Sequence, residues 1–103
     1  MNEQLISLFE FLQFKGYQRK KSIHTQPTLG AFSTQLFVVE PSNMYDQKRP
    51  TIHVAVWTNT LSQSNHVIYT IYLVERSDSD ALEITSFGRV VDFVNYYNER
   101  FID

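Results

Sequence analysis

Residues 51–58 read TIHVAVWT and residues 66–75 read HVIYTIYLVE, and these two stretches decide the fold. In both, the side chains alternate between two sets with a period of two, which is the period of a β-strand. The polar run 59–65 between them is typical of a hairpin loop. The two stretches therefore predict an antiparallel hairpin, and the second is the strongest strand signal in the chain.

The predicted hairpin is unusual because residues 51–74 contain no Asp, Glu, Lys or Arg. An antiparallel sheet with one face in water normally has a polar face. Neither face of this hairpin carries a charge, so we expect it to lie centrally and to be covered on both sides. The helices would cover one side, and a second subunit, a ligand or a long loop would cover the other. On this basis the interface residues of the hairpin are expected to be His53, Trp57, Tyr69 and Tyr72.

The N-terminal stretch 3–15 predicts an amphipathic helix. Its apolar residues are spaced i, i+3, i+4 and i+7, which places them on one stripe of a helix. The stripe consists of Leu5, Leu8, Phe9 and Leu12. Phe11 and Phe14 lie outside it, which indicates contacts on more than one side. Gly16 follows directly and is expected to end the helix, because glycine is favoured just after a helix C-terminus.

The stretch 89–101 predicts a second amphipathic helix with a solvent-exposed face of acidic and amide side chains. Its apolar stripe consists of Val90, Phe93, Val94, Tyr97 and Phe101. Thr85 or Ser86 is expected to cap its N-terminus, because a hydroxyl can accept a hydrogen bond from a free N–H of the first turn.

Further strands are predicted on either side of the hairpin. Residues 31–40 and residues 82–86 read as strands, and the polar, basic residues 17–24 read as an edge strand or an extended arm. The resulting order, with strands flanked by helices, is typical of an α+β fold. We therefore expect one domain over residues 1–103, with an antiparallel sheet of four to five strands between an N-terminal and a C-terminal helix.

The composition narrows the function classes. With 103 residues, one core is the default. The net charge of −2 argues against a general nucleic-acid binder, and the absence of cysteine excludes disulfides and thiolate metal sites. No apolar run is long enough to span a bilayer, and the polar start does not have the pattern of a secretion signal. We expect a cytoplasmic protein without a membrane partner.

No pattern in the chain predicts catalysis, a metal site or a cofactor. The serines do not occur in a nucleophile elbow, and the three glycines form no phosphate-binding loop. The histidines, which are His24, His53 and His66, do not have metal-ligand spacing. The carboxylates Asp78, Asp80 and Glu83 are clustered, but turn formation explains such residues better than cation binding. We therefore expect a protein that is not an enzyme.

A basic run is the one candidate for contact with an anion. Together with a lysine at the end of the first helix, it comprises Lys15, Arg19, Lys20 and Lys21. Basic tracks next to aromatic platforms hold single-stranded nucleic acids, and Trp57, Tyr69 and Tyr72 would supply the platform. The simpler interpretation of the basic run is a solvated edge strand.

The hypotheses rank as follows. The first is a small interaction or accessory module that forms a homodimer, or binds another protein, through the uncharged sheet face. The alternative is a nucleic-acid-binding domain that uses the basic arm and the aromatic side chains. A third hypothesis is a small-molecule pocket between a helix and the sheet, with Tyr or His side chains as polar contacts.

Overall fold

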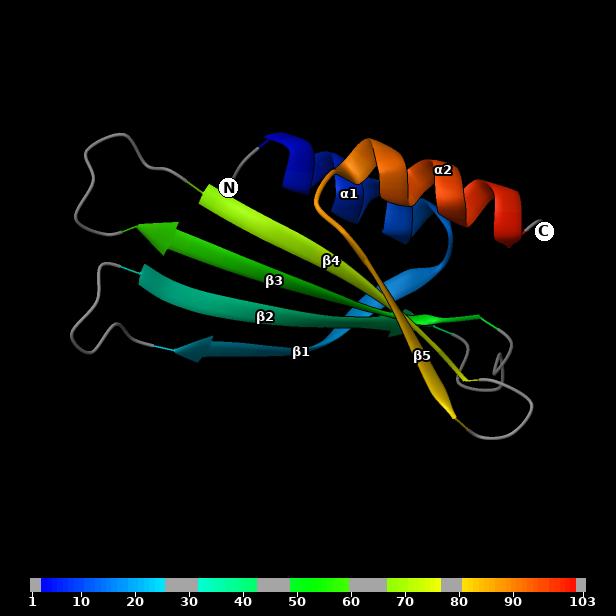
Figure 1. Cartoon of the computed structure of the whole chain (residues 1–103), viewed down its shortest axis with the longest axis horizontal. Helices are drawn as coiled ribbons and strands as arrows, with labels where there is room; N and C mark the ends of the chain where they lie inside the picture. Colours follow the sequence, from blue (N-terminus) through cyan, green and yellow to red (C-terminus); the bar gives the residue numbers. More distant parts are fainter. Residues whose placement is uncertain (1–2, 26–31, 43–48, 60–66, 77–80, 102–103) are drawn as a thin grey trace.

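The computed structural model describes residues 3–25, 32–42, 49–59, 67–76 and 81–101. Within these ranges the chain forms two helices and five strands, in the order helix, strands, helix (Figure 1). The elements are α1 (Glu3–Phe14), β1 (Tyr17–Thr25), β2 (Phe32–Pro41), β3 (Thr51–Asn59), β4 (Val67–Arg76), β5 (Leu82–Phe87) and α2 (Val90–Arg100). The predicted α+β class with an antiparallel sheet is confirmed.

The five strands form one sheet in which each strand pairs with its sequence neighbour, in the order β1-β2-β3-β4-β5. All four pairings are antiparallel. The uncharged hairpin of β3 and β4 pairs Val54 with Ile71 and His53 with Tyr72. Because β2 and β5 flank this hairpin, its central position is confirmed, and β1 is the edge strand that its lysines indicated.

Both helices lie on the same face of the sheet (Figure 1). The core forms between them and the sheet, where Leu5, Leu8 and Leu12 of α1 are buried with Phe93 and Tyr97 of α2. The sheet contributes inward residues of its first four strands, namely Tyr17, Phe37, Val39, Ile52, Val54, Val56, Ile71 and Leu73. The predicted stripes of both helices are thus the core faces, because a helix stabilises this fold by removing its apolar stripe from water.

Phe11 and Phe14 lie outside the α1 stripe for different reasons. Phe11 packs edge-on against Phe93 and Tyr97, with ring centroids 6.3 and 5.7 Å apart, so it joins the two helices. Phe14 is 86% exposed. The expectation that α1 is contacted on a second side is therefore met by Phe11 alone.

The C-terminus of α1 agrees with the sequence prediction, whereas the N-terminus of α2 does not. Gly16 has a φ of +87°, which is the left-handed conformation that glycine adopts without steric cost. The cap expected from Thr85 or Ser86 is wrong, because both residues lie within β5. The N-cap of α2 is Arg89, and its side chain makes no capping hydrogen bond. Alternation in the segment from Leu82 to Phe87 favoured the strand, which extends too far for either hydroxyl to reach the helix.

A network of hydrogen bonds between polar groups crosses the end of the core beneath the helices. The Arg49 guanidinium donates to the Tyr97 hydroxyl at 2.9 Å, and Tyr97 donates to the Tyr17 hydroxyl at 3.2 Å. Tyr17 in turn donates to the Pro50 carbonyl at 3.0 Å. The guanidinium also bonds to the Lys15 carbonyl at the end of α1 and lies 4.7 Å from the centre of the Tyr17 ring. These contacts join both helices to the start of β3.

Candidate protein-interaction surface

The face of the sheet opposite the helices, called the open face below, is built from the alternate residues that the core does not use. Ile52 and Val54 are fully buried under the helices, so their neighbours His53 and Ala55 point to the other side. The register carries this division across all five strands. The central residues of the open face are Leu36, Val38, His53, Ala55, Trp57, Thr70, Tyr72 and Val74.

Apolar side chains continue to both margins of the open face. Ile23 of β1 is 43% exposed and Ile68 of β4 is 48% exposed. On β5, Leu82 and Ile84 are 61% and 63% exposed. No described helix or strand covers this face, as Figure 1 shows for the helices. An uncharged surface with exposed apolar side chains on several strands is typical of an interaction site.

The charges of the described open face lie at its periphery. Lys21 is on the edge strand, opposite Val38. Glu40 follows Val38 by two positions near the end of β2, and Arg76 is the last residue of β4. An apolar centre with a polar rim is the usual anatomy of a protein interface. This arrangement gives the face a region of exclusively uncharged side chains around Trp57 and Tyr72.

Three of the four expected interface residues come together on this face. His53 and Tyr72 are register partners, and Trp57 lies four residues further along β3 on the same face. All three are half-buried. Tyr69 is on the opposite face, where it pairs with Val56, packs against the core and bonds through its hydroxyl to the Gln4 side chain. The structure therefore does not bring Tyr69 together with the other three.

The basic run is divided between surfaces. A β-bulge between Arg19 and Lys21 shifts the register of β1. Arg19 lies on the helix side, with its guanidinium 5.4 Å from the ring centre of Phe9. Lys21 lies on the open face, and Lys15 lies at the end of α1 with its ammonium 5.8 Å from the Phe11 ring centre. These cations do not form one track along the aromatic side chains of the open face.

Sequence reasoning missed several residues of this surface and the hydrogen-bond network beneath the helices. Leu82 and Ile84 were recognised as strand residues, and their alternation was the signal that could have placed them beside Val74 on the open face. Sequence reasoning gave Arg49 no role, because its partners Tyr17 and Tyr97 are 32 and 48 positions away. The one available signal was a tyrosine on a buried helical stripe, whose hydroxyl needs a partner.

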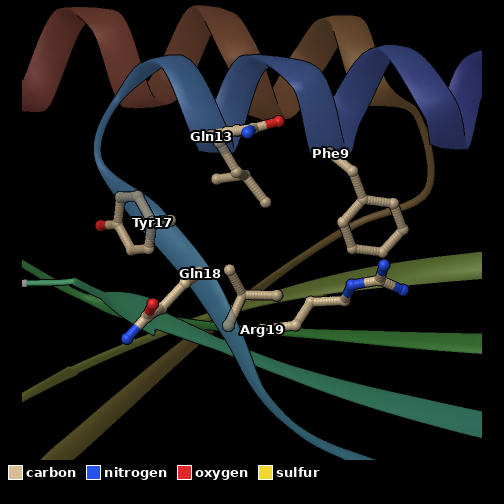
Figure 2. A pocket seen from close by; sticks show the side chains of 7 residues that line it. Phe9, Gln13, Tyr17, Gln18 and Arg19 are labelled. Carbon is tan, nitrogen blue, oxygen red and sulfur yellow. The ribbon is translucent and has the colours of Figure 1, made fainter.

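Described residues also line hollows away from the open face, and two of these hollows bear on function. One, of about 290 Å³, lies between α1 and the start of β1 (Figure 2). The other, of about 620 Å³, lies between the N-terminal ends of the helices, with Glu3 and Arg89 among its lining residues. Neither brings together three metal-ligating side chains, and no such group occurs in the described residues. His66, Asp78 and Asp80 lie outside those residues, as does the side chain of His24.

Neither described helix is long and apolar enough to cross a membrane. Comparison of the chain with protein-family models finds no match, and no curated protein or solved structure matches it significantly.

Proposed function

We propose that this protein is a small, non-enzymatic assembly module that forms a homodimer by packing the open faces of two copies against each other. The observation that carries the proposal is the position of both helices on one side of a sheet whose other side is uncharged at its centre and has exposed apolar side chains. Exposed apolar area favours association because its removal from water lowers the free energy. A symmetric dimer places the same patch of each copy in the contact, so a single self-complementary face is sufficient.

The size of the open face suits such a dimer. Five strands about 4.8 Å apart and eight residues of about 3.4 Å each span roughly 650 Å² before side-chain relief is counted. Stable protein interfaces bury about 800 Å² per partner. The open face is therefore of the size that one copy contributes to a stable interface.

Two such sheets would pack as the layers of a β-sandwich, about 10 Å apart and with strands inclined by about 30°. Trp57 and Tyr72 would form the centre of the contact, since large aromatic side chains dominate interface energetics. His53 and Thr70 supply polar groups near that centre. Lys21, Glu40 and Arg76 would remain at the rim, where water solvates their charges.

Nucleic-acid binding is the second candidate, and one observation favours it. Lys21 lies on the same face as Trp57 and Tyr72, so one phosphate contact and two stacking surfaces share a side of the sheet. The separation of Arg19 and Lys15 from that side reduces the electrostatic contribution on which such binding depends. We therefore rank it below self-association.

Sedimentation equilibrium over a wide concentration range tests the proposal. The expected mass is twice the 12.1 kDa of one chain, falling toward one chain on dilution. Trp57→Asp and Tyr72→Asp should each give a folded monomer at concentrations where the unmodified protein is a dimer, because each places an unpaired carboxylate in the contact. The matched control is Phe14→Asp, which introduces the same charge at an exposed aromatic residue away from the open face.

A second arm adds a labelled single-stranded oligonucleotide to the same samples. Self-association that is unaffected by the oligonucleotide supports the dimer. A monomer at every concentration that binds the oligonucleotide, and loses it when Lys21→Glu is introduced, would replace the dimer with the second candidate. A monomer that binds neither itself nor the oligonucleotide would contradict both.

A further inference from the structure

A groove between α1 and β1 combines an apolar hollow with a positive rim. Figure 2 shows Phe9 and Gln13 on the helix side and Gln18 and Arg19 on the strand side. Leu12, Tyr17 and Val39 complete the lining of the hollow. Leu12 and Val39 are almost fully buried, so its deepest part is apolar. This groove is on the helix side of the sheet and is separate from the open face.

Arg19 holds a cation over the hollow. Its guanidinium lies 5.4 Å from the ring centre of Phe9 and 5.6 Å from that of Phe37, which is the geometry of a cation–π contact. The side chain is exposed and makes no hydrogen bond or ion pair within the described residues. Lys20 and Lys21 follow and are also exposed. The guanidinium is thus oriented by the rings while its donors remain available to an anion.

The backbone beside the hollow is at a sheet edge, since β1 pairs only with β2 among the described strands. The Ser42 N–H donates to the Gly16 carbonyl at 2.7 Å, which fixes the alternation of this antiparallel ladder. The Gly16 carbonyl and the backbone groups of residue 18 then point toward β2, and Arg19 points its N–H and C=O away from it. Pro41, the register partner of Tyr17, is consistent with this alternation. Proline has no N–H, and this position makes no backbone hydrogen bond to β1.

The size of the hollow indicates what it can hold. Pockets for small molecules and cofactors usually measure about 300–1,000 Å³, so about 290 Å³ is at the lower limit. It accommodates one large apolar side chain better than a nucleotide or a similar cofactor. A strand that adds to a sheet edge inserts alternate side chains into such hollows, while its main chain supplies hydrogen bonds.

The positive charge of β1 indicates which charge the bound segment should carry. Lysines on an edge strand prevent indiscriminate pairing with apolar strands. The same lysines attract an extended segment that carries carboxylates. We propose that the groove between α1 and β1 binds an acidic peptide segment of a partner protein in extended conformation, which pairs with the backbone of Arg19 and inserts one aliphatic or aromatic side chain into the hollow. This site does not depend on the dimer proposed above.

The test uses a fluorescein-labelled nonapeptide of sequence Glu-Thr-Glu-Thr-Leu-Thr-Glu-Thr-Glu, whose leucine and glutamates share one face of an extended strand, added to the full chain. Binding is followed by fluorescence anisotropy and located by amide shifts in ¹⁵N-labelled protein. Saturable binding with the largest shifts at Gln18, Arg19 and Lys20 is expected. Replacing the central leucine by glutamine, replacing the glutamates by lysine, or methylating the central backbone nitrogens should each weaken binding at least tenfold.

Protein variants complete the test. Arg19→Glu and Lys20→Glu should each weaken binding at least tenfold, and both change exposed residues outside the core, so folding is retained. Arg76→Glu, the same change at an exposed arginine distant from the groove, should leave it unaffected. The proposal is overturned if the acidic nonapeptide shifts no amide of β1 at millimolar concentration, or if a twelve-nucleotide oligothymidine occupies these residues more tightly than the peptide.

Discussion

Arg49 reaches from just before β3 to the hydroxyl of Tyr97 on α2, and the two groups are joined by a hydrogen bond of 2.9 Å. Tyr97 is fully buried, and its hydroxyl also donates to Tyr17, so it satisfies two polar partners at the end of the core. No buried side-chain nitrogen or oxygen of the described residues is left without a partner. Polar groups buried together in this way are stabilising only while every member is paired.

Tyr97→Phe should therefore destabilise the fold by about 1–2 kcal/mol, since it removes the acceptor of the Arg49 guanidinium and a donor to Tyr17. In thermal unfolding this corresponds to a decrease in Tm of about 4–8 °C per kcal/mol for a domain of this size. The matched control is Tyr96→Phe on the same helix, because the Tyr96 hydroxyl makes no hydrogen bond within the described residues. Equal Tm values for the two variants would contradict the role assigned to the Tyr97 hydroxyl.

Gly16→Ala should cost about 1–2 kcal/mol, because a Cβ is unfavourable in the left-handed conformation. The added Cβ would also meet the Arg49 guanidinium at 3.4 Å. Gly88→Ala provides the comparison, since Gly88 does not have a positive φ and nothing lies within 4 Å of its Cβ position. Urea unfolding should show Gly88→Ala to be neutral or slightly stabilising. A loss of stability at Gly88 equal to that at Gly16 would rule out the conformational explanation.

Arg89→Ser should stabilise the protein by about 0.5–1 kcal/mol. The N-cap of α2 has extended backbone angles but no capping side chain, and serine supplies an oxygen for the free N–H groups of the first turn. The substitution also removes a cation from the positive end of the helix dipole. Ser86→Ala should change the free energy of unfolding very little, as Ser86 is in β5. If Ser86→Ala is the more damaging variant, the cap assignment is wrong.

Salt distinguishes the two candidate functions. Dimerisation through an uncharged face should change its Kd by less than about threefold between roughly 0.05 and 0.5 M sodium chloride, because only rim charges are screened. Sodium sulfate should strengthen it, as an excluded salt favours apolar burial. Binding to a nucleic acid would instead weaken steeply over the same range. Analytical ultracentrifugation in these salts gives the comparison.

The fold could be predicted from local patterns because its elements are long and periodic. The period of two in 51–58 and in β4 divided each strand into two faces, and the helical stripe of α2 specified the face that the structure buries. The absence of charge in 51–74 indicated that the hairpin lies centrally in the sheet. The same feature motivated the interface hypothesis, for which the sheet provides the surface around Trp57.

Other features required the three-dimensional structure because they depend on residues distant in the sequence. Alternation already separated Tyr69 from Tyr72, but which set lies under the helices is decided by the packing of α1 on the sheet. The bulge beside Lys20 divides a basic run that is continuous in the sequence. The groove at Arg19 also requires Phe9 and Val39. These three residues belong to three different elements, namely β1, α1 and β2. No local sequence pattern indicates that residues of three elements lie close together.

The most direct test of the open face uses the fluorescence of Trp57, which is the only tryptophan of the chain. If two copies cover this side chain, its emission should be blue-shifted and poorly quenched by acrylamide in concentrated solution, and dilution should shift the emission to the red as the sedimenting mass halves. Emission and quenching that stay constant with dilution, in a species with the mass of one chain throughout, would contradict the account.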